Sequence, residues 1–107
     1  MPNQGIWGID RDFFATETLT IGGTAVGLTV AIYAPATAVA PQQPASYAVI
    51  TVEGDQVRFW PTGDPTATLG ILLNVNDMVE LHGVNEIRTF RAIRVTNNAT
   101  LQVAYAR

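Results

Sequence analysis

The chain has 107 residues and a mass of 11.5 kDa, which suits one domain and is too small for separate cofactor and substrate domains. It contains no Cys, so disulfides and thiolate metal sites are excluded. The net charge is −3 and all six basic residues are Arg, whereas a protein that binds nucleic acid normally carries clustered cations to neutralise phosphates. We therefore expect a folded domain that does not bind nucleic acid.

The first twelve residues form a polar segment that contains glycine, and we expect them to be an N-terminal arm (1–12) preceding a single domain (13–107). The arm lacks the basic start and apolar run of a signal peptide, and no stretch reaches the roughly 18 apolar residues of a membrane span. We therefore expect synthesis in the cytoplasm and no membrane partner. Asp10 and Asp12 could hold a structural calcium only together with carbonyl oxygens, and their spacing is far short of an EF-hand loop. We therefore expect no metal and no cofactor.

Short runs of Thr, Val, Ile and aromatic residues begin at Phe13, and such runs are typical of strands. In 25–33, large apolar residues alternate with small or polar ones, which predicts a strand with one buried face. The runs 47–53 and 57–60 alternate in the same way. They are separated by Gly54 and Asp55, a pair that predicts a tight hairpin with a positive φ at the glycine.

The C-terminal half continues this pattern, with strand-like runs at 70–73, 78–82, 90–95 and 101–105. The polar residues 96–98 predict a second hairpin between the last two runs. Residues 85–90 can hold at most one short helical turn, capped by Asn85. We therefore expect an all-β antiparallel sandwich of about seven or eight strands, either jelly-roll or immunoglobulin-like, because two sheets can bury their apolar faces against each other.

One long connection, residues 34–46, carries three prolines that cannot donate to a sheet ladder. It is either an ordinary surface loop or a strap that lies against a neighbouring subunit and presents Val39 to it. In the second alternative, the prolines would stiffen the loop and so lower the entropy lost on docking.

The inventory of reactive side chains argues against an enzyme. The chain has one His, His82, and one Ser, Ser46, with no nucleophile-elbow motif around the serine. The aspartates lie in the arm or in turns, where this residue type commonly bonds nearby backbone amides. We therefore expect no catalytic residues.

The aromatic residues are better candidates for function. Neighbouring side chains on a strand point to opposite faces, so Trp60 must lie on the face opposite Phe59 and beside Arg58. Trp and Arg are enriched at interface hot spots, whereas Trp60 and Tyr47 could instead form a platform for a sugar. A third alternative is that loops of the same chain cover Trp60. The expected interface residues are Trp7, Phe13, Val39, Arg58, Trp60 and Arg91.

The order of motifs over 13–107 resembles a group of small proteins encoded among the virion structural genes of tailed bacteriophages and prophages. The motifs that carry this resemblance are FATETLT (14–20), AVITVE (48–53), VRF (57–59), DPTATLG (64–70), LLN (72–74), FRAIR (90–94) and ATLQVAY (99–105).

The resemblance implies a capsid cement or decoration protein on the virion surface, which stabilises the head by binding between capsomers. The implied partners are the major capsid protein and other copies of the chain, arranged as a homotrimer. Residues 57–66 are also similar to small immunoglobulin-like modules attached to bacterial glycosidases, although the turn here is Gly63-Asp64 rather than Asp-Gly. The alternative function is therefore a carbohydrate-binding module on a phage tail or virion surface.

Overall fold

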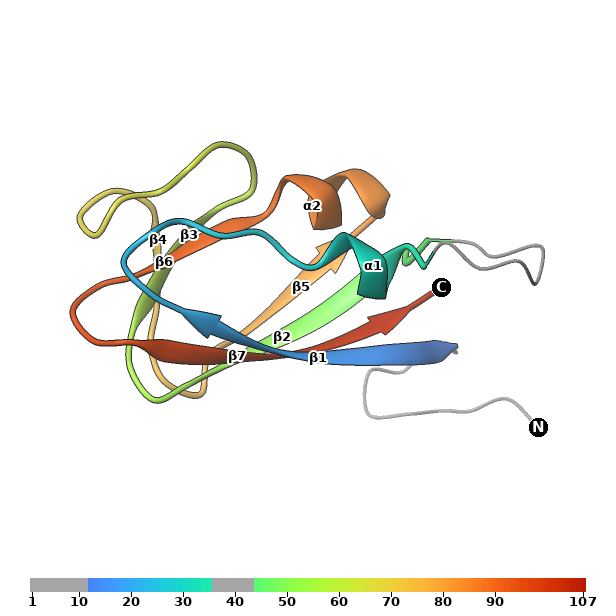
Figure 1. Ribbon diagram of the computed structural model, residues 1–107, viewed down its shortest axis with the longest axis horizontal. Coiled ribbons are helices and arrows are strands. Elements are labelled where there is room, and N and C mark those ends of the chain that lie inside the picture. The colour runs from blue at the N-terminus through green and yellow to red at the C-terminus, as the bar shows by residue number, and fades with distance from the viewer. Residues whose placement is uncertain (1–11, 36–43) are drawn as a thin grey trace.

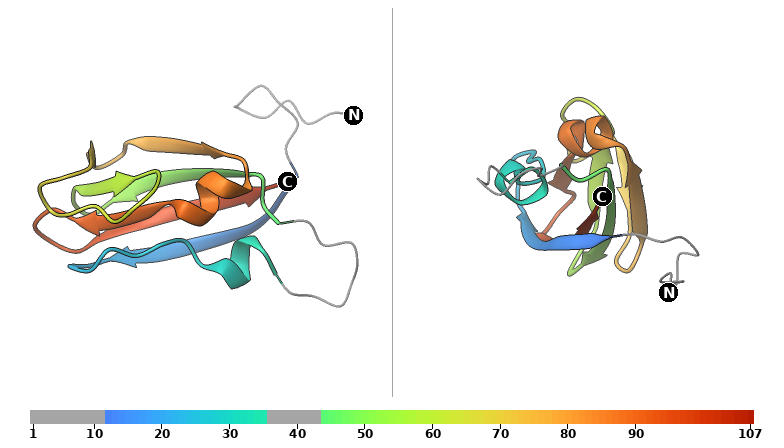
Figure 2. Two further views of the ribbon diagram at one scale, coloured as in Figure 1. Left: turned by 90° about the horizontal axis from the view of Figure 1, so that it is seen from above. Right: turned by 90° about the vertical axis from the view of Figure 1, so that its right-hand side faces the viewer.

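The computed structural model describes residues 12–35 and 44–107, and they fold into two antiparallel sheets packed face to face (Figures 1 and 2). The elements are β1 (Phe13–Ile21), α1 (Val30–Tyr33), β2 (Tyr47–Glu53), β3 (Val57–Trp60), β4 (Ile71–Leu73), β5 (Met78–His82), α2 (Val84–Thr89), β6 (Arg91–Arg94) and β7 (Ala99–Ala106). The larger sheet has the strand order β1-β7-β2-β5 and the smaller has the order β4-β3-β6. The expected all-β sandwich is confirmed.

The strand pairing is nested, and this identifies a jelly roll rather than an immunoglobulin-like sandwich. β1 pairs with β7, Val26 bridges Ala92 on β6, β2 pairs with β5, and β3 pairs with β4. The chain can thus be drawn as one long hairpin whose turn is at 61–70. When this hairpin is wound into the sandwich, the further pairs β2–β7 and β3–β6 form. In a jelly roll of eight strands, the second strand would lie where this chain has only the bridge at Val26.

The prediction of a strand over 25–33 is wrong. Only Val26 makes a bridge there, and α1 forms at Val30–Tyr33, so the described residues contain two helices rather than at most one helical turn. The expected alternation fails at Val30, whose side chain is 60% exposed instead of facing the core.

A buried carboxylate explains why this segment leaves the extended path. Glu17 on β1 accepts hydrogen bonds from both the backbone amide and the hydroxyl of Thr29, the residue just before α1. The turn of α1 then places the ring of Tyr33 in the core against Tyr105, with the ring centroids 5.9 Å apart. Side-chain hydrogen bonding of this kind competes with a sheet ladder and ends the strand.

Both predicted hairpins are also wrong. β2 and β3 lie in different sheets, as do β6 and β7, so each turn carries the chain across the sandwich. Gly54 does adopt the expected positive φ, at 90°. The two turns are joined by Asp55, which accepts hydrogen bonds from the Gln56 amide at 2.7 Å and the Asn97 side-chain amide at 2.8 Å. The bond from Asn97, and then that from Gln56, lowers the pKa of Asp55.

The helical turn expected at 85–90 is present as α2, and Ile87 anchors it in the core. The residue at its N-cap is Gly83 rather than Asn85, and no side chain caps it. The main core lies between the sheets. Its largest fully buried side chains are Tyr105, Phe90, Ile21, Ile50, Ile87, Leu101, Val52 and Val57.

Candidate interaction surfaces

The outer face of the three-stranded sheet brings together three of the expected interface residues. Val57 and Phe59 point into the core, so Arg58 and Trp60 point outward, as alternation along the strand predicts. The register places Arg91 opposite Trp60 and Leu72 opposite Arg58. Trp60 is 37% exposed, so its ring is available on this face.

The two arginines on this face have different surroundings. Arg58 donates from Nε to the carbonyl of Ala67 at 3.1 Å and from Nη1 to the carbonyl of Gly70 at 2.9 Å. It therefore holds the long loop between β3 and β4 in place. The Nε atom of Arg91 is 4.0 Å from Asp64 Oδ1 in a well-exposed pair, which is a weak interaction in water. Arg91 is thus the arginine whose guanidinium can turn to a partner at little cost.

The outer face of the four-stranded sheet carries a row of rings from three strands. Phe13 meets Tyr47 edge to face with ring centroids 6.1 Å apart, and Tyr47 lies 5.4 Å from the ring of His82. Phe13 is therefore on the opposite side of the sandwich from Trp60. Tyr47 is only 1% exposed, so its ring is not available as the candidate sugar platform that the sequence suggested.

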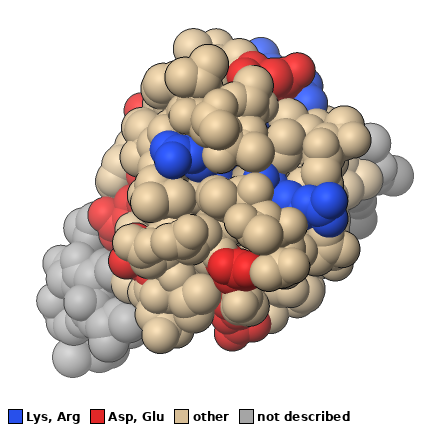
Figure 3. Space-filling view, turned by 90° about the vertical axis from the view of Figure 1, so that its left-hand side faces the viewer, with Lys and Arg blue, Asp and Glu red and all other residues tan. Residues whose placement is uncertain are grey.

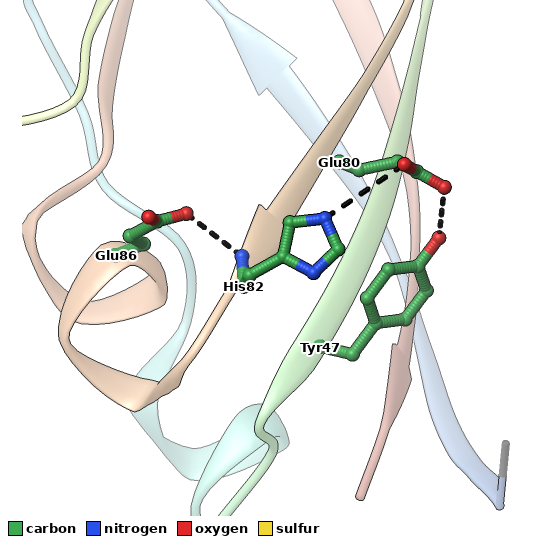
Figure 4. A network of polar contacts seen from close by, with 4 residues as sticks. All are labelled: Tyr47, Glu80, His82 and Glu86. Carbon is green, nitrogen blue, oxygen red and sulfur yellow. Dashed lines mark hydrogen bonds and ion pairs between the residues drawn. The ribbon is translucent and has the colours of Figure 1, made fainter.

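Polar contacts extend from this row to the end of β5 (Figure 4). The Tyr47 hydroxyl donates to Glu80 Oε2 at 2.5 Å, and Glu80 Oε1 lies 3.8 Å from His82 Nε2. Glu86 on α2 accepts a hydrogen bond from the backbone amide of His82 at 2.7 Å. These contacts fix the end of β5 against β2 and α2.

Phe13 and Phe14, which are adjacent on β1, also point to opposite faces, as neighbouring residues on a strand do. Phe13 packs with the small outer cluster of Tyr47, Val49 and Ala106, whereas Phe14 packs against the main core. The guanidinium carbon of Arg107 lies 3.8 Å from the centroid of the Phe14 ring, which is the geometry of a cation–π contact.

A shallow hollow of about 420 Å³ lies on the outer face of the four-stranded sheet. Gln102 in its wall accepts a hydrogen bond from the Thr18 hydroxyl at 2.8 Å and donates to Glu53 at 3.2 Å. The lining holds neither an aromatic ring nor an ionisable side chain, so it offers no sugar platform and no acid–base pair. The lining residues are Thr16, Val49, Thr51, Met78, Gln102, Val103 and Ala104.

Two of the expected interface residues, Trp7 and Val39, lie outside the described residues, as does Asp10. Within 12–35 and 44–107, no three His, Asp or Glu side chains gather closely enough to hold a metal ion. None of the helices in these ranges has the length and apolar character needed to cross a membrane. The charged residues seen from one end of the molecule are scattered over a mostly uncharged surface (Figure 3).

A group of exposed aliphatic side chains, on β4 and in the residues next to it in the chain, was not predicted from the sequence. The sequence did carry a signal for this apolar surface, because the stretch 65–76 contains no charged residue. The group consists of Leu69, Ile71, Leu72, Val75 and Met78.

Comparison with protein-family models, curated proteins and solved structures finds no match to this chain.

Proposed function

We propose that this chain is a structural protein of a tailed-bacteriophage virion, a cement or decoration protein that binds the capsid surface between capsomers. The observation that carries the proposal is the joint exposure of Trp60 and Arg91 on the outer face of the three-stranded sheet. The resemblance over 13–107 supports the same role. The jelly roll is also an architecture used by viral capsid domains, although a fold alone does not fix a function.

These residue types suit contact with a protein shell. The Trp60 ring offers a large rigid apolar area and one N–H donor, and such rings commonly supply the centre of an interface. The guanidinium of Arg91 can form a forked pair with a carboxylate of the major capsid protein. The net charge of −3 limits adhesion of the chain to packaged DNA.

Co-sedimentation with capsids of the phage or prophage that encodes the chain tests this proposal. We expect the wild-type protein to bind, and Trp60→Ala to weaken binding by about 30-fold, the effect of losing a hot-spot side chain. Val30→Ala, at an exposed apolar position on α1, is the matched control and should bind as the wild type does. Failure of the wild type to bind capsids, or equal binding by Trp60→Ala, would contradict the proposal.

The alternative, a carbohydrate-binding module, rests on the same exposed ring. It is less well supported, because its second expected ring, Tyr47, is buried. Glycan-array binding that Trp60→Ala abolishes, in a protein without affinity for capsids, would favour this alternative.

A further inference from the structure

Exposed aliphatic side chains are concentrated in one stretch of the chain, which forms the edge strand β4, the turn after it and the start of the edge strand β5. Among the described residues, seven large apolar side chains are exposed, and five of them fall between positions 69 and 78. Their exposed fractions lie between 39% and 63%. They are Leu69, Ile71, Leu72, Val75 and Met78.

β4 differs from the other three edge strands of the described sheets. β5 carries Glu80, β6 is bridged by Val26 and begins and ends with Arg, and β1 holds the segment before α1 through Glu17 and Thr29. β4 has the sequence Ile-Leu-Leu and, within the described residues, pairs only with β3. Natural proteins usually protect an edge with charge, proline or a cover, because an open edge pairs with other strands.

We propose that β4 pairs with β4 of a second copy of the chain, antiparallel and around a twofold axis at Leu72. The two three-stranded sheets would then join into one continuous sheet, in which backbone hydrogen bonds supply affinity and side chains set the register. Leu72 would face Leu72 of the second copy, and Ile71 would face Leu73. This inference goes beyond the proposed function and does not depend on it.

The absence of charge on this edge allows a second copy to occupy it, although each copy is acidic. Each copy has a net charge of −3, so two copies repel each other when acidic surfaces meet. The uncharged stretch 65–76 is a surface at which two identical strands can approach without like charges facing each other.

The side chains of β4 favour the same occupant. Ile71 lies opposite Phe59 on the inner face of the strand and Leu72 lies on the outer face, and both are exposed. A paired strand therefore has apolar surface to bury on both of its faces. An identical strand supplies aliphatic side chains on both faces in return.

The first test is the mass in solution, measured by size-exclusion chromatography with light scattering across the micromolar range. We expect the wild type to be a dimer, and Leu72→Lys to raise the dissociation constant at least about tenfold, because two ammonium groups would meet at the axis. Val30→Lys adds the same charge at an exposed apolar position of α1 and should remain dimeric. Trp60→Ala should also remain dimeric, which separates this interface from capsid binding.

The second test uses the absence of cysteine, which makes any introduced thiol unique. Residues directly opposite each other in an antiparallel pair have Cα atoms about 4.5–5.5 Å apart, within the range of a disulfide. Leu72→Cys should therefore form a cross-linked dimer under mild oxidation, whereas Val30→Cys should not. A monomeric or trimeric wild type, or equal cross-linking at positions 30 and 72, would overturn the proposal.

Discussion

The carboxyl group of Glu17 is a polar group inside an otherwise apolar sandwich. It accepts a hydrogen bond from the Tyr105 hydroxyl at 2.6 Å and two more from Thr29. A buried polar group without partners is strongly destabilising, so these bonds make its position tolerable. Because all three bonds end on one carboxyl group, they also connect β1, β7 and the segment before α1.

We predict that Tyr105→Phe lowers the free energy of unfolding by about 2 kcal/mol, because a hydrogen bond to a buried carboxyl group is lost while the group stays buried. Urea denaturation would measure the loss. The matched control is Tyr47→Phe, which removes a similar bond to Glu80. The Glu80 side chain is 40% exposed, so water can replace the lost donor and the effect should be smaller. Equal losses in the two variants would contradict the role assigned to Glu17.

The contact between Tyr105 and Glu17 also makes the stability of the fold depend on pH in the alkaline range. Burial, and then the hydrogen bond to Glu17, raises the pKa of Tyr105 above its ordinary value of 10.0. The folded state therefore holds this proton more tightly than the unfolded state does, so the stabilisation is complete below about pH 10 and falls as the pH rises further. Urea midpoints measured across that range should fall in the wild type and fall less steeply in Tyr105→Phe. Parallel curves for the two proteins would show that Tyr105 does not cause the loss.

The sequence predicts the strands better than it predicts which strands pair with each other. Alternation placed Phe59 inward and Trp60 outward correctly, because the two faces of a strand follow directly from its geometry. The turns at Gly54 and at 96–98 were also located correctly. Their residues specify that the chain reverses, but not whether the next strand pairs with the last one or crosses to the other sheet. That choice depends on contacts such as the one between Asp55 and Asn97.

The prediction of a strand over 25–33 failed for a different reason. The sequence there does alternate between large apolar and smaller residues, but the chain is redirected by a hydrogen bond to Glu17, which lies on another strand. The candidate surfaces show the same limit. Trp60 could be predicted to face outward, whereas its pairing with Arg91 depends on register, and the exposure of Ile71 depends on β4 being the last strand of its sheet.

The loop between β3 and β4 depends on Gly70, and we predict that Gly70→Ala destabilises the protein by about 1–3 kcal/mol. The residue has a φ of +137°, and an added Cβ would lie 3.1 Å from the Cβ of Pro65 and 3.2 Å from the Cβ of Arg58. Thermal and urea unfolding would measure the loss. Gly22→Ala is the control, since its new Cβ would meet only the Asn98 side chain at 3.8 Å. A change in Gly70→Ala no larger than in this control would contradict the predicted strain.

The nested pairing brings the two ends of the domain together, because its first strand, β1, pairs with its last strand, β7. β7 lies between β1 and β2, so the last strand is paired along both of its edges. The segment 24–34 makes far fewer hydrogen bonds to the sheets. Its hydrogen bonds to the sheets are the two between Val26 and Ala92, each 2.9 Å long, and those from Thr29 to Glu17. The segment 24–34, which makes one bridge where a full jelly roll has a strand, should therefore have low local stability inside an otherwise cooperative fold.

Amide hydrogen exchange followed by mass spectrometry or NMR tests this difference. We predict that amides of β7 and β2 exchange only through global unfolding, whereas those of 24–34 exchange faster through local opening. Thr29→Val removes the hydroxyl that bonds Glu17 while keeping a similar shape, so it should speed exchange in 24–34 more than its effect on global stability can explain. Equal protection of 24–34 and β7 in the wild type would contradict this prediction. It would mean that one backbone bridge and one carboxyl group hold the segment 24–34 as firmly as a full set of strand hydrogen bonds holds β7.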